Sequence, residues 1–167
     1  IIVLSQLDKM TEYVIKNLEF YNSSYGNHLI NNFRGILSYA ITFQNEKLIE
    51  TFSKLMDEYL DDFIEDGFTK DFSSHYQLLV YFWVYDLSEL AKKRSQKNIA
   101  KLLNKHLKPL YEKSMFFYSK KSKHLSLFGD ISPDLPPKYL ISLLDSEYFF
   151  NKQYSALHLY KDNHYVG

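Results

Sequence analysis

The stretch Ser73-Ser74-His75-Tyr76-Gln77-Leu78-Leu79-Val80-Tyr81-Phe82-Trp83-Val84-Tyr85 decides the fold class. Its last eight residues are apolar throughout, and a helix that is apolar on all faces is buried on most of its sides. β-Branched and aromatic residues would also allow a strand here. The Ser-Ser start, however, is a helix-capping signal, and the helical spacing of apolar residues continues to Ala91. The sequence therefore predicts an inner helix from Ser73 or Ser74 to about residue 93.

Amphipathic segments on both sides of this inner helix predict further helices. Apolar residues recur at helical spacing in four segments, residues 5–20, 27–43, 46–66 and 96–118. Asn45 is placed to cap the third of these segments, and Pro109 predicts a kink or a break in the last. Loops are expected at residues 22–26 and 66–72. Successive helices joined by short loops pack as antiparallel pairs, so the predicted fold class is all-α.

The last third of the chain is patterned differently. Residues 123–137 carry Gly129 and three prolines, which indicates a loop, and a short helix is expected at residues 138–144. Residues 1–144 are therefore predicted to form one helical domain, and residues 145–167 an aromatic segment that leads toward a following domain. The chain starts without Met and without the pattern of a signal peptide, so we expect it to be part of a longer protein.

Composition limits the classes of partner. Acidic and basic residues balance at 20 each and the pI is near 7.2, so neither nucleic acid nor an anionic membrane is expected as a partner. The longest apolar run, residues 78–85, is far shorter than the roughly 20 residues that span a bilayer. Cysteine is absent, which excludes a disulfide framework and a thiolate metal site, and no metal or cofactor is predicted. The 15 tyrosines fit either biased codon usage or a carbohydrate cleft.

Three places concentrate polar side chains where a loop meets a helix. The first is Gly26-Asn27-His28. Asn31 and Arg34 follow Asn27 at positions i+4 and i+7, so these three side chains share one face of the predicted helix. They either contact a substrate or form a helix cap and a solvated face, and the spacing alone favours the cap.

The second place is Ser73-Ser74-His75-Tyr76-Gln77, at the start of the most buried predicted helix. A partly dehydrated Tyr76 can donate or accept a proton there if the local field lowers the pKa of its phenol. The alternative is a core tyrosine with one satisfied hydroxyl group, which spacing alone favours. His75 has no His or carboxylate partner at metal-ligand spacing.

The third place is the loop Phe128-Gly129-Asp130-Ile131-Ser132-Pro133-Asp134-Leu135-Pro136-Pro137. Asp130 and Asp134 can bind a cation or sugar hydroxyl groups, or they can form Asx turns in a loop braced by proline. The chain has neither a glycine-rich phosphate loop nor a nucleophile elbow, so nucleotide and acyl-transfer enzymes are not indicated.

Taken in order, these places resemble the heparinase II/III-like polysaccharide lyases. Asn27-His28-Leu29-Ile30-Asn31-Asn32 is similar to that family's Asn-His-Leu-x-x-Asn helix start. Asp66-Gly67-Phe68 through Ser73-Ser74-His75-Tyr76 is similar to its Asp-Gly and acid-x-Ser-x-x-Tyr segment. Phe128-Gly129-Asp130-Ile131-Ser132-Pro133-Asp134 resembles a later loop of members encoded with surface-polysaccharide assembly genes. The resemblance extends from about residue 22 to residue 140.

The resemblance implies an incomplete α/α toroid of antiparallel helix pairs, followed by a C-terminal β-sandwich domain. It also implies β-elimination in an acidic, uronate-containing polysaccharide such as heparan sulfate or alginate. Asn27 and His28 match the positions that neutralise the uronate carboxylate, and Tyr76 matches the acid that protonates the departing O4. The remaining candidates for contact with the substrate are Asn31, Arg34, His75, Gln77 and Asp130.

Two positions depart from the family pattern, since Gln77 replaces a common His and Asp71 replaces the usual Glu. A second His or Tyr of the family site lies beyond this chain, so the isolated 167 residues are expected to be inactive. The alternative function is a non-catalytic glycan-binding or scaffolding module in surface-polysaccharide production, which Gln77 favours. A helical protein-interaction domain is a third reading. The sugar, the linkage and the bacterial compartment, periplasmic or cytoplasmic, stay open.

Overall fold

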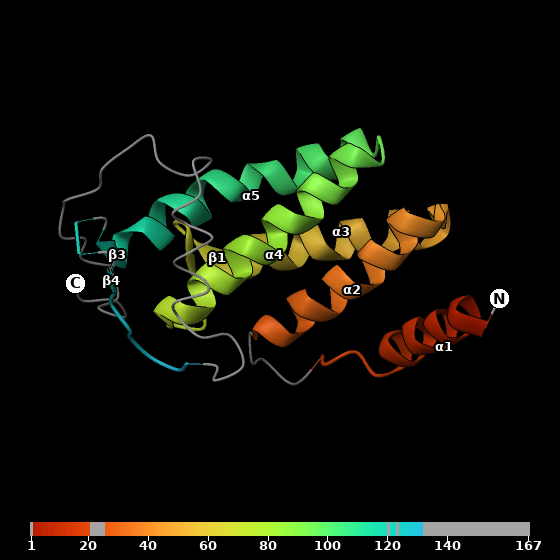
Figure 1. The fold of residues 1–167 in the computed structure, drawn as a ribbon, viewed down its shortest axis with the longest axis horizontal. Helices are drawn as coiled ribbons and strands as arrows, with labels where there is room; N and C mark the ends of the chain where they lie inside the picture. The colour runs from red at the N-terminus through yellow and green to blue at the C-terminus, as the bar shows by residue number, and fades with distance from the viewer. Residues whose placement is uncertain (1, 21–25, 120, 123, 132–167) are drawn as a thin grey trace.

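The computed structural model describes residues 2–20, 26–119, 121–122 and 124–131 (Figure 1). Its helices are α1 (Ile2–Lys16), α2 (Asn27–Phe43), α3 (Glu46–Phe63), α4 (Ser74–Lys93) and α5 (Lys97–Phe116). Two short antiparallel hairpins accompany them, formed by β1 (Ile64–Glu65) with β2 (Phe68–Thr69) and by β3 (Tyr118–Ser119) with β4 (His124–Leu125). The described part of the chain is therefore mainly helical, which confirms the all-α prediction.

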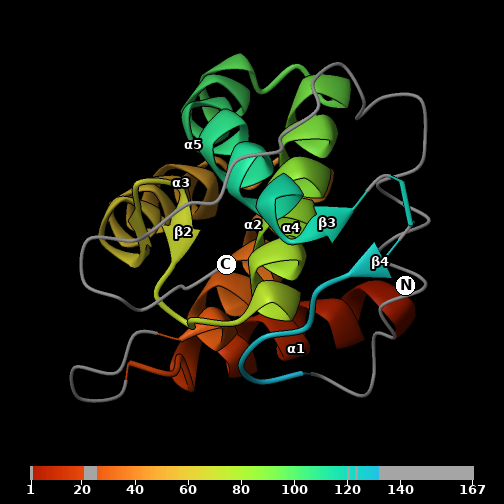
Figure 2. The ribbon, with the colours of Figure 1, turned by 90° about the vertical axis from the view of Figure 1, so that its left-hand side faces the viewer.

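Consecutive helices run in opposite directions, with α2 and α3 as one antiparallel pair and α4 and α5 as a second (Figures 1 and 2). Short connections enforce this arrangement. Gln44 ends α2 in the left-handed conformation, and Asn45 caps α3 by accepting a hydrogen bond from the Leu48 N–H at 3.2 Å. Because α2 and α4 run in the same direction and pack together, both begin at the same end of the molecule (Figure 1).

Helix α4 is the inner helix that its sequence predicts. It packs against both α5 and α2, and its residues Leu78, Val80 and Val84 expose none of their surface. Burial of each large apolar side chain of this kind stabilises the fold by about 1.5–3 kcal/mol. The first turn of α4 is polar but is also largely buried, so the position of its side chains is set by the core.

Helices α3, α5 and α1 differ in part from the prediction. The third helix ends at Phe63, before a hairpin in which Asp66 and Gly67 have φ angles of 50° and 87°. A Cβ atom on Gly67 would lie 2.7 Å from the Pro109 carbonyl oxygen, so the hairpin fits against α5 only with glycine there. Helix α5 is continuous through Pro109, so of the kink or break predicted there the break does not occur. Helix α1 covers residues 2–16 instead of 5–20.

The predicted short helix at residues 138–144 and the segment at residues 145–167 lie outside the described residues, as does the part of the predicted loop from residue 132 onward. Asp134 falls in that part. Among the helices that are described, none combines the length and the apolar character needed to cross a membrane.

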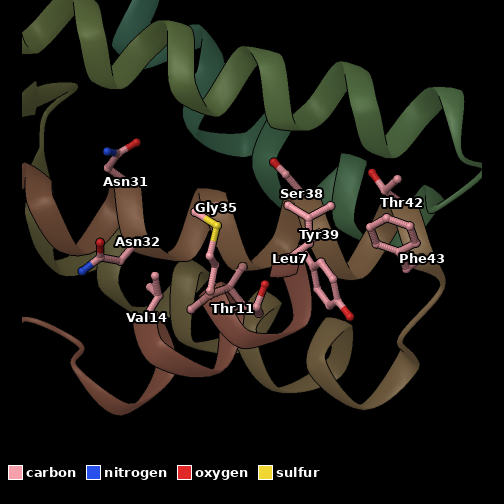
Figure 3. Close-up of a pocket in the computed structure, with 12 residues that line it drawn as sticks. Leu7, Thr11, Val14, Asn31, Asn32, Gly35, Ser38, Tyr39, Thr42 and Phe43 are labelled. Atoms are coloured by element: carbon pink, nitrogen blue, oxygen red, sulfur yellow. The ribbon is translucent and has the colours of Figure 1, made fainter. Parts of the chain in front are cut away.

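Helix α1 packs along one side of α2 and leaves a groove of about 480 Å³ between the two helices (Figure 3). Leu7, Met10 and Val14 of α1 line it from one side, and Asn31 lies at its edge on α2. The Tyr39 hydroxyl group donates to the Asp8 carboxylate and so joins the two helices beside the groove.

Candidate functional site

The end at which α2 and α4 begin brings Asn27 together with Asp71, which lies in the connection between β2 and α4. Asp71 accepts hydrogen bonds from both the backbone N–H and the side-chain amide of Asn27. The N-cap residue Gly26 has no side chain to cap α2, so Asp71 satisfies one of the N–H groups that a helix start leaves unpaired. The Tyr59 hydroxyl group of α3 fixes Gly26 through its N–H at 2.9 Å and its carbonyl oxygen at 3.0 Å.

Ser73 joins the start of α4 to the third polar place. Its hydroxyl group accepts a hydrogen bond from the Tyr76 N–H at 3.2 Å, which caps α4, and donates to the Asp130 carbonyl oxygen. The single side chain of Ser73 therefore positions both Tyr76 and Asp130, two residues that the sequence indicated separately.

The segment at residues 126–131 lies over the start of α4. The Ser74 N–H donates to the Phe128 carbonyl oxygen at 3.0 Å, and the Phe128 N–H donates to Ser74 Oγ at 2.9 Å. Gly129 has a φ angle of 74°, and a Cβ atom on it would lie 2.3 Å from the Phe72 carbonyl oxygen. Only glycine permits this close approach of two backbones, which holds Asp130 near Asp71.

The Asp71 carboxyl group is in an environment that disfavours its charge. Burial raises its pKa to about 6, against the lowering effect of the Asn27 hydrogen bonds and of the His28 charge, and Asp130 raises it further. Within the described part of the chain, Asp71 Oδ2 is buried and has no hydrogen-bond partner. A buried polar atom without a partner is costly, so it marks a place where a structural or functional reason is required.

The neighbouring faces of α2 and α4 carry the other candidates. The Arg34 guanidinium lies over the Trp83 ring, with 5.7 Å between its central carbon and the ring centroid. Asn27 precedes Arg34 by seven residues, and Tyr76 precedes Trp83 by the same number. Because the two helices run in the same direction, this equal spacing puts Tyr76 within about one helical turn of the level of Asn27.

We call this surface the α2–α4 face, and it consists of Asn27, Asn31, Arg34, Tyr76 and Trp83. Asn31 is exposed, whereas Arg34, Tyr76 and Trp83 are half-buried. Asn27 is at its floor, with 9% of its surface exposed. The face combines amide groups, a guanidinium and two aromatic rings, which is a mixture suited to sugar rings and to carboxylates.

His28 lies at the start of α2 beside Asn27 and close enough to act on the charge of Asp71, whereas His75 and Gln77 lie in the core. His28 is exposed, and its Nδ1 atom lies 2.8 Å from Glu19 Oε2. His75 has no exposed surface and stacks edge-on against Tyr76. Gln77 is also fully buried, so neither His75 nor Gln77 can touch a polymer in this conformation.

The hydrogen bonds of Gln77 show a structural task. Its side-chain oxygen accepts from the Thr69 N–H at 2.8 Å, and its amide group donates to the carbonyl oxygens of Gly67 and Leu110 at 2.9 and 3.3 Å. Gln77 therefore ties the β1–β2 hairpin to α5. The sequence identifies it as a candidate for substrate contact only because it follows Tyr76.

A second charged cluster, between α3 and α5, was not anticipated from the sequence. Lys105 Nζ lies 2.5 Å from Asp57 Oδ1 and 3.0 Å from Asp61 Oδ2. His106 Nε2 lies 3.1 Å from Asp57 Oδ1 and 3.7 Å from Asp61 Oδ1. The two carboxylates and the imidazole are close enough to hold a metal ion, but the Lys105 ammonium already lies against both carboxylates. The available signal was the i, i+4 spacing of Asp57 and Asp61.

The contacts within this cluster, together with its burial, shift the pKa values of its members. Burial opposes ionisation of Asp57, but hydrogen bonds from Lys105 and His106 outweigh it, and the pKa of Asp57 is lowered. Burial lowers the pKa of His106 despite its contact with Asp57. The pKa of Lys105 is raised, since the two carboxylates outweigh the effect of its partial burial. The cluster is an ion-pair network that joins α3 to α5.

Comparison with known protein families, with curated proteins and with solved structures finds no match to this chain. The resemblance to heparinase II/III-like lyases therefore remains a prediction from the motifs.

Proposed function

We propose that this chain is the helical domain of a lyase that cleaves uronate-containing polysaccharide by β-elimination. In this proposal its antiparallel helix pairs are part of an incomplete α/α toroid, and a β-sandwich domain follows in the longer protein. The observation that carries the proposal is that three polar places, far apart in the sequence, meet at the common end of α2 and α4. Asn27 bonds to Asp71, and Ser73 bonds to both Tyr76 and Asp130.

The proposed chemistry assigns a task to each residue of the site. Removal of the C5 proton builds negative charge beside the uronate carboxylate, so donors must neutralise that carboxylate. The Asn27 amide keeps one N–H that Asp71 does not bind, and His28 lies beside it in the sequence. Tyr76 would protonate the departing O4 as general acid. Asn31 and Arg34 would contact neighbouring sugar units along the α2–α4 face.

The test is an assay of alginate and heparan sulfate with the 167-residue chain and with a longer protein that contains it. β-Elimination produces a conjugated unsaturated uronate, which is followed by its ultraviolet absorbance. Tyr76→Phe is expected to lower the rate of the active protein by about 10²–10⁴-fold, the usual contribution of a general acid. Tyr85→Phe, a change of the same kind further along α4, serves as the control. Equal rates for the Tyr76→Phe and Tyr85→Phe proteins would contradict the assignment.

A non-catalytic glycan-binding module is the second candidate function. It is favoured by Gln77, which stands where the family commonly has a His and which is occupied by three structural hydrogen bonds. Binding of an acidic oligosaccharide without any rise in absorbance would support this function. A loss of that binding in Arg34→Ala would place the ligand on the α2–α4 face.

A further inference from the structure

The contacts of Asp71 give it a position between the two helices of the proposed site. Through Asn27 it holds the start of α2, and it lies only two residues before Ser73, the cap of α4. The backbone N–H and the side-chain amide of Asn27 both donate to the Asp71 carboxylate. Asp71 therefore fixes the orientation of the Asn27 side-chain amide. The amide group is planar, so a hydrogen bond from one of its N–H groups also determines where the other N–H and the oxygen point.

The surroundings of Asp71 determine how it responds to an acidic ligand. Among the described residues, the charged groups that act on it are His28 on α2 and Asp130 in the segment at residues 126–131. Within the part of the chain that the structure describes, Oδ2 is buried and has no hydrogen-bond partner. A uronate carboxylate that reaches Asn27 would therefore meet a second negative charge close behind the amide.

We propose that Asp71 is a positioning residue that orients the Asn27 amide and that makes binding of an acidic ligand at Asn27 depend on the loss of its own charge. This inference rests on the proposed function for its ligand class. Asp71 does not touch the ligand, because its free oxygen is buried, and it acts through Asn27 and through its charge. The site therefore binds uronate more tightly when Asp71 is neutral.

The direction of the pH effect follows from linkage. The pKa of Asp71 is about 6 without ligand, and a neighbouring anion raises it further. A rise of one unit on binding corresponds to an affinity that falls by about tenfold between pH 5 and pH 8. The experiment measures binding of an alginate tetrasaccharide to this chain by calorimetry across that range. The carboxyl-reduced tetrasaccharide is the neutral control ligand and is expected to lack the pH dependence.

Asp71→Asn separates charge from hydrogen bonding, because the asparagine oxygen can still accept from Asn27. Its affinity for the acidic tetrasaccharide is expected to fall less between pH 5 and pH 8 than that of the wild type. Asp86→Asn removes the same charge from an exposed position on α4 and is expected to keep the wild-type profile. An Asp71→Asn protein that retains the wild-type pH profile would overturn the inference, while the proposed function would stand.

A measurement without ligand tests the positioning step by itself. The side-chain NH₂ resonances of Asn27 are expected to shift with an apparent pKa near 6 in the wild type and to stay constant in Asp71→Asn. Constant resonances in the wild type would overturn the positioning role. Titrating resonances without binding at any pH, both to this chain and to a longer protein that contains it, would instead overturn the proposed function and, with it, the ligand class, leaving Asp71 as the residue that orients Asn27.

Discussion

Two aspartates of this molecule, Asp71 and Asp57, are both partly buried, but their pKa values are shifted in opposite directions. Burial is the largest effect on each and favours the neutral form. Asp57 has Lys105 and His106 as fixed partners across the α3–α5 interface, and its pKa is lowered. Asp71 has an amide as its main partner, and its pKa is raised to about 6. The difference has two causes, since Asp71 is more deeply buried than Asp57 and its main partner is a neutral amide, whereas Asp57 is held by Lys105 and His106.

The two places also differ in what they connect. The Asp57 cluster joins two helices along their length through ion pairs, which is a structural arrangement. Asp71 lies where two helices begin, and its Oδ2 atom has no partner within the described residues. Groups with disfavoured charge occur preferentially at functional sites, because a structural role is served better by a satisfied pair.

The largest expected effect comes from removing Asp57. Asp57→Ala leaves the His106 imidazole buried without its nearest acceptor and Lys105 without one of its two partners, so we expect a loss of about 2–3 kcal/mol of unfolding free energy at pH 7. Urea denaturation measures it. Glu58→Ala, at the next position and exposed, is the control and is expected to change stability by less than about 0.5 kcal/mol. Equal losses in the two proteins would show that the ion pairs of Asp57 do not stabilise the fold.

Removal of the charge at Asp71 is expected to raise the unfolding free energy, in contrast to the loss expected for Asp57→Ala. A carboxyl group whose pKa rises from 3.8 to about 6 on folding stabilises the fold below pH 3.8 and loses that contribution as the pH rises through 6. The difference between these two pKa values sets a ceiling of about 3 kcal/mol on the effect. Asp71→Asn is therefore expected to raise stability by about 1–2 kcal/mol at pH 8 and by almost nothing near pH 4. Chemical denaturation at both pH values measures this, and a destabilised variant at pH 8 would refute the prediction.

A smaller effect is expected from Lys105→Met. The side chain of Lys105 is 43% exposed, so water screens its two ion pairs and the expected loss is about 0.5–1 kcal/mol. The substitution also removes one of the groups that hold the pKa of Asp57 down, so that pKa should rise. Carboxyl ¹³C NMR titration measures the change at Asp57. An unchanged Asp57 titration in the variant would show that Lys105 does not set it.

The smallest expected effect is a change in how steeply the melting temperature falls with pH when His106 is replaced. Burial lowers the pKa of His106, so its neutral form contributes stability above the unfolded pKa of 6.5, and this contribution is lost as the pH falls through the folded value. His106→Gln should therefore flatten the decline of melting temperature on the acidic side of pH 6.5. His124→Gln, at an exposed position in β4, should leave the decline unchanged. A decline of equal slope in both variants would assign the acid sensitivity to other groups.

The sequence predicts the helices well wherever apolar periodicity and capping residues agree. The bounds of α2 match residues 27–43, and α4 begins after Ser73 and ends at Lys93 as expected. The β1–β2 hairpin was missed, since strands of two residues carry no periodicity. Asp66 and Gly67 were recognised as a turn, but its shape depends on the carbonyl oxygen of Pro109, which is distant in the sequence.

The site was only partly accessible from the sequence. The polar face of Asn27, Asn31 and Arg34 follows from spacing alone, but its contact with Trp83 requires knowledge of which helices pack together. His75 and Gln77 look like surface residues because they are polar and open a helix. They are buried because the β1–β2 hairpin, α5 and the segment at residues 126–131 pack against the start of α4. These segments are distant in the sequence, so the residues around His75 and Gln77 carry no sign of the burial.

The contact between Ser73 and Asp130 joins residues that are 57 positions apart, and that between Ser74 and Phe128 joins residues 54 apart. Closing so long a loop costs entropy before any contact forms, so distant contacts tend to be made late in folding. During synthesis, the start of α4 therefore has to wait for residues 126–131 to leave the ribosome. Helix α4, which packs between α2 and α5, is therefore completed at its polar start last, and we expect chains released before that point to be the ones that aggregate.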